Sequence, residues 1–418
     1  MSTIKNISGL EILDSRGRPT VKATIQLQND IIAKASVPSG ASTGNAEAIE
    51  LRDDDASRYA GMGCRKAVAH IEGEIREHLT GKRFSDTFQL DQALIDLDGT
   101  PNKKRLGANA ILAVSMAFSK AKAMEEGKPL FQYFAELINQ KPKTLPRPTI
   151  NLFSGGLHAG GIVPIQDCLI VPVSAQTMDE CLSMTTAVYQ SAAGLIKKHY
   201  GMRLLTADEG GLSPDFKNAE EMLSLAIEAI HEAGLEPGKD IALALDIAAS
   251  HFYKSRKYYI NQDALNGNQM IDLLDDWMQK YPIISLEDGL AENDWKYWTL
   301  LKKRIEKQAI VLGDDLLCTN EKRIQKAIDT QAANALLLKV NQIGTLHEAS
   351  RSLRLAKAHD WAVTISARSG ETEDDWLADL AVGWSGDYIK IGSINQSERL
   401  AKYNRLLEIE KEFGFPLT

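Results

Sequence analysis

Short apolar runs that each end in a polar residue mark the second half of the chain. They cover residues 241–246, 283–288, 310–315, 335–341, 362–366 and 388–390. Runs of about four to eight apolar residues predict buried strands. Stretches with a helical pattern, such as 320–330 and 344–359, lie between them. Repeated strand–helix units predict a parallel sheet, either closed into a barrel or doubly wound.

The first third of the chain has a different pattern. Residues 21–32 alternate and are rich in β-branched side chains, which predicts a strand. Residues 39–44 are small and glycine-rich, which predicts a loop. Residues 106–122 are rich in Ala and Leu and predict a buried helix, which Gly127 and Pro129 would end. Strands and helices in separate blocks indicate an α+β domain.

A proline-rich connection separates these two patterns. Residues 141–148 contain three prolines, which exclude a helix. We therefore predict a domain boundary near residue 138. Residues 1–138 form the α+β domain, and residues 139–418 are long enough for a complete barrel.

Composition narrows the class of protein. The chain has 418 residues, and 48 Lys and Arg against 56 Asp and Glu give a net charge of −8. This balance argues against a nucleic-acid binder. No apolar run reaches the ~20 residues of a membrane span, and the first residues lack the pattern of a signal peptide. The four cysteines share no CxxC spacing, so we expect reduced thiols and a cytoplasmic protein.

Three acidic residues end successive predicted strands. In a βα barrel the carboxyl ends of the strands face one mouth, so Asp246, Glu287 and Asp314 should converge there. Three neighbouring carboxylates repel one another unless a cation lies between them. Oxygen ligands alone favour a hard cation such as Mg²⁺. The alternative is that these acids only end strands or cap the next helices.

Two lysines end the later strands. A divalent metal and burial would favour the neutral amine of Lys339, which can then remove a proton. Lys390 offers a second cation at the same mouth. Lysine is also common at protein surfaces, but both residues follow buried runs.

Three glycine-rich segments hold further candidates. Glu209 lies in ADEGGLSP and is a candidate second acid–base group, although DEGG is also typical of a turn. His158 lies in SGGLHAGG; a lone histidine is usually structural, but its glycine neighbours favour contact with a ligand. Arg368 and Ser369 lie in SARSGET, which suits binding of a phosphate or carboxylate.

Many long motifs of the chain resemble, in order, those of the enolase family. They are EILDSRG, VPSGASTG at 37–44, LGANAIL at 106–112, DEGG at 208–211, LEDGLAENDW at 286–295, GDDLLCTN at 313–320, LLLKVNQIGTL at 336–346, RSGETEDD at 368–375 and SERLAKYN at 397–404. The resemblance implies an enolase-like modified (β/α)8 barrel with an N-terminal α+β capping domain. It implies Mg²⁺-dependent dehydration of 2-phosphoglycerate to phosphoenolpyruvate through an enolate, and a homodimer.

The resemblance also implies roles for single residues. Lys339 matches the base and Glu209 the acid. Asp246, Glu287 and Asp314 match the ligands of a conformational Mg²⁺, and Ser42 helps hold a second, substrate-linked Mg²⁺. The remaining positions match contacts to a small phosphorylated carboxylic acid. They are His158, Gln166, Asp167, Arg368, Ser369 and Lys390.

Several positions depart from the family pattern, all but the last two in pocket motifs. Ala367 stands where enolases carry His, Asp167 where they carry Glu, and Leu157 where they carry Ser. The other departures are Gly161, Gln396 and Leu10, the last replacing an Arg that resembles a dimer contact. We therefore weigh three hypotheses: an ordinary enolase, a paralogue that acts on a related phosphorylated or phosphonate acid, and a non-catalytic binding or structural protein.

Overall fold

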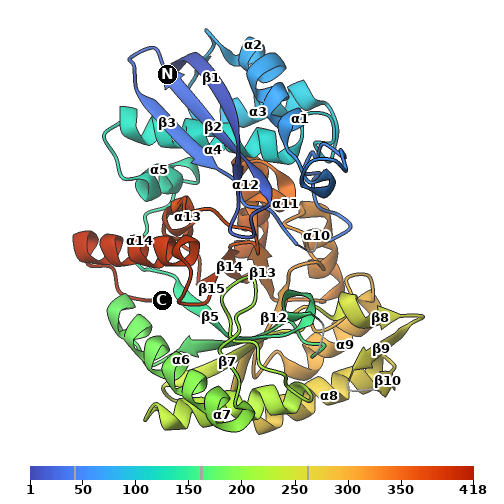
Figure 1. Ribbon diagram of the computed structural model, residues 1–418. Helices are drawn as coiled ribbons and strands as arrows, with labels where there is room; N and C mark the ends of the chain where they lie inside the picture. The colour runs from blue at the N-terminus through green and yellow to red at the C-terminus, as the bar shows by residue number, and fades with distance from the viewer. Residues whose placement is uncertain (42–43, 161–162, 261–262) are drawn as a thin grey trace.

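The computed structural model describes residues 1–41, 44–160, 163–260 and 263–418. Figure 1 shows an antiparallel sheet with its helices above a closed barrel. None of the helices in these ranges combines the length and apolar character that crossing a bilayer requires. The predicted fold class is therefore confirmed: an α+β part precedes an α/β barrel.

The N-terminal part is built on a four-stranded sheet in the order β3-β2-β1-β4. Its strands are β1 (Ser2–Leu13), β2 (Pro19–Leu27), β3 (Ile32–Ser36) and β4 (Arg83–Phe84). The single strand predicted over 21–32 was wrong. The chain turns between β2 and β3, where Asp30 has a φ of 66°, and the alternating pattern continues across this turn because both strands pack on the same core.

Helices cover one face of this sheet. They are α1 (Arg65–His70), α2 (Arg76–Leu79), α3 (Thr87–Asp98), α4 (Ala108–Glu125) and α5 (Leu130–Leu137). The predicted buried helix is α4, which packs on β2 and β3 and is buried on nearly every side. It starts later than predicted because Gly107 has a φ of 95°, a conformation outside a helix.

The barrel is closed in the order β11-β12-β13-β14-β15-β5-β6-β7. Seven strands are parallel, and β6 runs antiparallel to both of its neighbours. The strands are β5 (Arg147–Ser154), β6 (Asp167–Pro172), β7 (Ile241–Asp246), β11 (Ile283–Glu287), β12 (Ile310–Gly313), β13 (Ala335–Leu338), β14 (Ala362–Ser366) and β15 (Tyr388–Gly392). The reversal of β6 distinguishes this barrel from one in which all eight strands are parallel.

Helices connect and surround the barrel strands (Figure 1). They are α6 (Met178–Tyr200), α7 (Ala219–Glu232), α8 (Gly267–Lys280), α9 (Trp295–Ile305), α10 (Glu321–Thr330), α11 (Val340–Ile343), α12 (Leu346–Lys357), α13 (Trp376–Gly383) and α14 (Ser397–Phe413). A small sheet of β8 (Tyr253–Lys254), β9 (Lys257–Ile260) and β10 (Asp263–Leu265) lies outside the barrel. Each predicted apolar run coincides with a barrel strand at its start, but three runs extend beyond their strands, and the run 388–390 covers only part of β15. The chain leaves the strand at Asp288 (φ 43°), and α11 already begins after Lys339.

The N-terminal part is joined to the barrel through a buried carboxylate on α3. Asp91 accepts the backbone N–H of His347, in the first turn of α12, at 2.9 Å. Burial raises the pKa of Asp91 to about 7, and the hydrogen bonds from the Ser115 hydroxyl and from the His347 N–H offset only part of this effect.

We expect Asp91→Asn to change how stability depends on pH. Because the folded-state pKa lies above the unfolded value of about 3.9, the carboxyl group costs stability as the pH rises from about 4 to 7. The free energy of unfolding of the variant, relative to the native protein, should thus rise by about 1 kcal/mol per pH unit in this range. Urea titrations at several pH values measure it. Asp96→Asn, an exposed carboxylate on the same helix, should give a flat difference, and a flat difference for Asp91→Asn would contradict the prediction.

Candidate active site

The three predicted carboxylates lie side by side at the mouth of the barrel. Asp246 ends β7 and pairs in register with Glu287, which ends β11. Glu287 in turn pairs with Leu312 of β12, and Asp314 follows that strand directly. The first two are buried, with 2% and 3% of their surface exposed. Neighbouring parallel strands thus bring the three acids together, as their shared position at strand ends predicts.

Both predicted lysines contact these carboxylates. The Nζ atom of Lys390 lies 2.7 Å from Asp246 Oδ2 and 2.7 Å from Glu287 Oε2. The Nζ atom of Lys339 donates to Asp314 Oδ2. Burial lowers the pKa of Lys339, but the Asp314 and Glu287 carboxylates outweigh it and hold that pKa above its ordinary value. The neutral amine predicted for Lys339 therefore requires a change in the charge around it.

The negative charges of the buried acids repel one another. Burial, followed by the charges of Asp246 and Asp314, raises the pKa of Glu287 well above its ordinary value. Its Oε1 atom is buried and has no hydrogen-bond partner in the described part of the chain. Positive charge placed beside this oxygen would relieve both effects.

The oxygen atoms that line this rim, the edge of the barrel mouth formed by Asp246, Glu287 and Asp314, suit a hard divalent cation. The rim offers three carboxylates, and Gln166, which donates to Asp246 Oδ2 at 2.9 Å, has its own buried oxygen unpaired. As the side chains stand, no three Asp, Glu, His or Cys side chains in the described ranges are arranged to hold a metal ion. Lys390 instead bridges two of the acids. A cation at Glu287 therefore requires this ammonium group to share or leave its position.

Asp288 fixes the backbone that carries Asp314. Its two carboxylate oxygens accept the N–H groups of Asp314 and Asp315 at 2.9 and 2.7 Å. This contact explains why the chain leaves the strand at Asp288. The sequence pattern had not singled out this residue, although the consecutive acids LED and GDD are visible in the motifs.

Glu209 and Asp167 form a second acidic pair. Asn151 of β5 donates to Glu209 Oε2 at 3.2 Å, and Ser154 donates to Asp167 Oδ1 at 2.5 Å. Burial and the neighbouring charge of Glu209 raise the pKa of Asp167 well above its ordinary value. Because β6, which begins at Asp167, lies four strands from β13 in an eight-stranded barrel, this pair faces Lys339 across the mouth.

The glycines beside Glu209 lie against other side chains of the protein. A Cβ atom at Gly210 would lie 1.9 Å from Asn395 Oδ1, and one at Gly211 would lie 2.3 Å from Ser154 Oγ. The DEGG segment therefore needs glycine because it packs against other side chains of the protein, which fixes the position of Glu209.

Arg368 and Ser369 are held by the N-terminal part of the chain. The Arg368 guanidinium contacts Glu47, and Arg16 donates to Ser369 Oγ at 3.0 Å. Sequence reasoning missed Glu47 and Arg16, because nothing in their local pattern indicates that they reach the barrel. Two other predicted residues lie outside what the structure describes: Ser42, and the side chain of His158.

The fold and the mouth define a class of protein: an α/β barrel with an N-terminal α+β part, whose rim carries adjacent carboxylates and two lysines. Residues 142–416 match the family model described as "Enolase, C-terminal TIM barrel domain". Residues 4–134 match "Enolase, N-terminal domain". The chain belongs to the enolase family, and the predicted resemblance is confirmed. Domains of this family are those of lyase-type enzymes with enolase-like chemistry, and they generally bind Mg²⁺.

Proposed function

We propose that the protein catalyses the Mg²⁺-dependent dehydration of 2-phosphoglycerate to phosphoenolpyruvate through an enolate intermediate. The observation that carries the proposal is the placement of Lys339, beside the rim carboxylates, across the mouth from Glu209. Proton removal and departure of a hydroxyl group from adjacent carbons require a base and an acid on opposite sides of the substrate.

In this proposal the side chains divide the work. Lys339 takes the proton from C2, and Glu209 gives a proton to the C3 hydroxyl, so that water leaves as the double bond forms. Arg368 and Ser369 bind the phosphate group, and Lys390 binds the substrate carboxylate. Asp246, Glu287 and Asp314 would hold one Mg²⁺ ion and Ser42 would help to hold a second, and these ions would supply positive charge for the enolate.

A second candidate function is favoured by the truncated side chains in the pocket. Ala367 follows β14, is buried, and has no polar atom beyond its backbone. Asp167 is one methylene shorter than glutamate, and its Oδ2 atom has no partner among the described residues. By the family resemblance, the histidine that Ala367 replaces contacts the phosphate and leaving-group region. These differences support a paralogue that uses the same enolate chemistry on a different phosphorylated or phosphonate acid.

One assay separates the candidates. The purified protein receives 2-phosphoglycerate and MgCl₂, and the ultraviolet absorbance of the enol product is followed. Exchange of the C2 proton is measured in parallel in deuterated water. Turnover supports the first function, and exchange without turnover supports the second. Neither turnover nor exchange in a folded protein favours the third hypothesis, a binding or structural protein.

We expect Ala367→His to raise the dehydration rate at least tenfold if the native protein is slow with 2-phosphoglycerate. An imidazole at this position restores a hydrogen-bond donor beside the departing hydroxyl group, and a placed donor typically contributes ~10²–10⁴-fold. Absorbance of the enol product measures the change. Ala362→His, at the opposite end of β14, is the matched control and should leave the rate unchanged. An unchanged rate in Ala367→His with normal substrate binding would show that this position is not the deficit.

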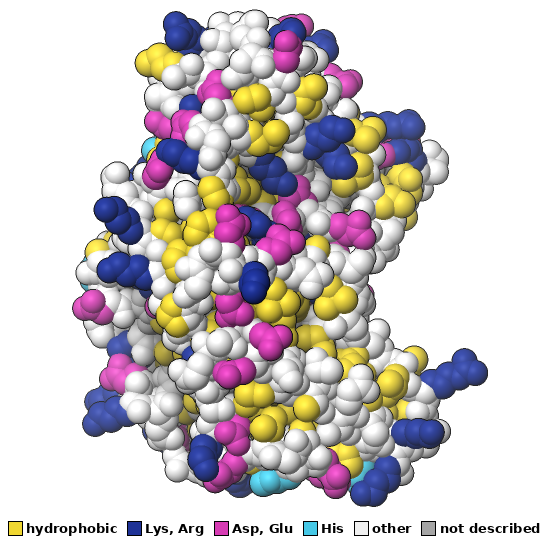
Figure 2. All heavy atoms as spheres, turned by 90° about the vertical axis from the view of Figure 1, so that its left-hand side faces the viewer, with side chains coloured by type: hydrophobic (Ala, Val, Ile, Leu, Met, Phe, Trp, Pro, Cys, Tyr) yellow, Lys and Arg dark blue, Asp and Glu magenta, His cyan; other side chains and the backbone are white. Residues whose placement is uncertain are grey.

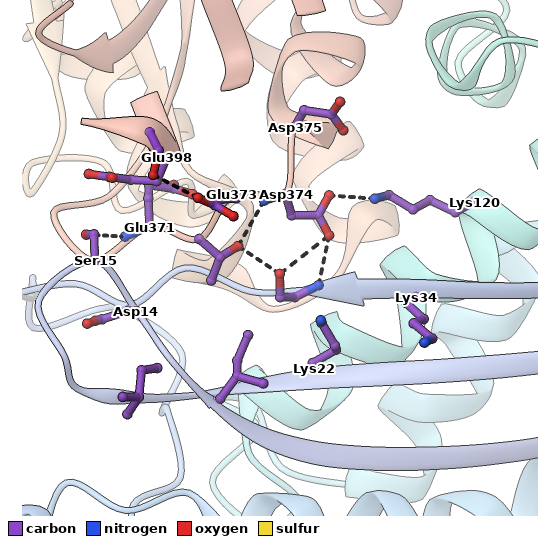
Figure 3. A pocket seen from close by; sticks show the side chains of 15 residues that line it. Asp14, Ser15, Lys22, Lys34, Lys120, Glu371, Glu373, Asp374, Asp375 and Glu398 are labelled. Atoms are coloured by element: carbon purple, nitrogen blue, oxygen red, sulfur yellow. Dashed lines mark hydrogen bonds and ion pairs between the residues drawn. The ribbon is translucent and has the colours of Figure 1, made fainter. Parts of the chain in front are cut away.

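The homodimer also remains a proposal. A groove of about 600 Å³ lies between the N-terminal sheet and residues 371–375. Lys22, Lys34 and Lys120 line it together with Glu373 and Asp374 (Figure 3), and Lys120 pairs with Asp374 at 2.5 Å. Acidic, basic and hydrophobic side chains alternate on this side of the molecule (Figure 2).

Leu10 and Leu13 of β1 are 58% and 52% exposed. These exposed leucines, beside charges of both signs, support docking of a second copy here.

A further inference from the structure

The geometry points to Glu47 as a positioning residue that fixes the Arg368 guanidinium in the barrel mouth, and so sets how tightly the mouth holds a phosphate group. This inference rests on the proposed function, in which Arg368 grips the phosphate. Glu47 belongs to the N-terminal part of the chain, whereas Arg368 follows β14 of the barrel.

The contact between the two residues is bidentate and buried. Arg368 Nη1 lies 3.0 Å from Glu47 Oε2, and Nη2 lies 3.3 Å from Oε1. Nη1 also donates to Asn341 Oδ1 at 3.0 Å, which engages both of its hydrogens. The side chains are only 3% and 6% exposed. Two parallel hydrogen bonds fix the plane of a guanidinium as well as its position.

Glu47 is itself held rigidly by both parts of the molecule. Its carboxylate accepts the N–H of Gly44 at 3.0 Å and the side-chain amide of Gln342 at 3.4 Å. The backbone N–H of Ala48 donates to the carbonyl of Gln342 at 2.7 Å. A Cβ atom at Gly44 would lie 2.5 Å from Cys318 Sγ, so the segment packs directly on the barrel loops. Glu47 is therefore a fixed support for Arg368 rather than a mobile group that an incoming phosphate displaces.

The glutamine that contacts Glu47 also contacts a carboxylate of the barrel mouth. The side-chain amide of Gln342, in α11, also donates to Asp314 Oδ1 at 2.7 Å. The Gln342 side-chain oxygen accepts the hydroxyl of Thr319 at 2.7 Å, which fixes the orientation of the amide. A single amide thus connects Glu47 with a carboxylate of the proposed metal site. A substitution of Glu47 should therefore change phosphate binding by Arg368 more than it changes metal binding at Asp314, because the contact of Glu47 with Arg368 is ionic.

A double-mutant cycle on phosphate binding tests the inference. Calorimetric titration with inorganic phosphate in excess MgCl₂ is carried out on the native protein, Glu47→Gln, Arg368→Ala and the double variant. We expect Glu47→Gln to weaken phosphate binding about tenfold in the native background and to have no further effect once Arg368 is alanine. Glu47→Asp, which keeps the charge, should recover part of the loss. It replaces Glu47→Gln in the cycle if that variant does not fold.

The matched control is Glu348→Gln, which removes another ion pair between the two parts of the chain, that of Lys103 with Glu348. It should lower the melting temperature without changing phosphate affinity. The inference is overturned if Glu47→Gln binds phosphate as the native protein does, if its effect persists without Arg368, or if the native protein takes up no phosphate. Failure of the proposed function is seen separately, because a protein that neither turns over nor exchanges 2-phosphoglycerate can still show this coupling with inorganic phosphate.

Discussion

Lys339→Ala should abolish exchange of the C2 proton of 2-phosphoglycerate, with a loss of about 10²–10⁴-fold or more. In the proposed function this amine is the group that accepts the proton, and no other described lysine is paired with Asp314. The same variant should retain or improve binding of Mg²⁺, because Asp314 then has no ammonium partner and its charge becomes available to a cation. Proton exchange followed by nuclear magnetic resonance, with calorimetric titration of MgCl₂, measures the two effects.

Lys357→Ala is the matched control for Lys339. Lys357 forms the same kind of pair, at 2.5 Å from Asp387, but on the outer helix α12. Its removal should leave exchange unchanged. Native-like exchange in Lys339→Ala would mean that another group is the base. Loss of Mg²⁺ binding together with exchange would mean that Lys339 supports the metal site rather than the proton transfer.

Glu287→Gln should remove most of the affinity for Mg²⁺, by about two orders of magnitude or more. Glu287 lies between Asp246 and Asp314, and its unpaired, buried Oε1 is the oxygen best placed to gain from a cation. A ligand that binds only the folded state stabilises it by about 2.7 kcal/mol at a hundred times its dissociation constant. MgCl₂ should therefore raise the melting temperature of the native protein but not that of the variant.

The native protein and the variant should also differ when the metal is removed. Without a cation, Glu287 is a buried acid beside two others, so Glu287→Gln should melt at or above the temperature of the native protein in a chelator. Asp379→Asn is the control, because this buried acid pairs with Arg405 away from the mouth. It should melt lower but keep its response to MgCl₂. If MgCl₂ raises the melting temperature of Glu287→Gln as much as that of the native protein, the metal binds at another site.

The barrel was predictable because its strands are buried on both faces. Such strands appear as continuous apolar runs, and every predicted run lies on a strand of the barrel. The ends of the strands were less predictable. The chain leaves the extended conformation at Asp288, whose carboxylate accepts the N–H groups of Asp314 and Asp315, and no local pattern records that contact.

The N-terminal sheet and the first barrel strands were harder to predict. β1, the longest strand, carries exposed residues on much of its length and so lacks a clear alternating pattern. β6 is as apolar as the parallel strands, so nothing in its own pattern indicates that it pairs antiparallel with β5 and β7. The boundary near residue 138 stays a prediction from the prolines alone.

The chemical groups of the mouth follow from the sequence, because acids and lysines that end buried strands of a barrel face the same side. The family follows from the sequence too, through long motifs in a fixed order. The partners of these groups became visible only in the folded molecule: Lys390 contacts Asp246 and Glu287, and Arg368 contacts Glu47. Distance accounts for this difference. Hydrogen bonds and ion pairs act over a few ångströms in space, and Glu47 and Arg368 are brought within that range only when the N-terminal part packs on the barrel.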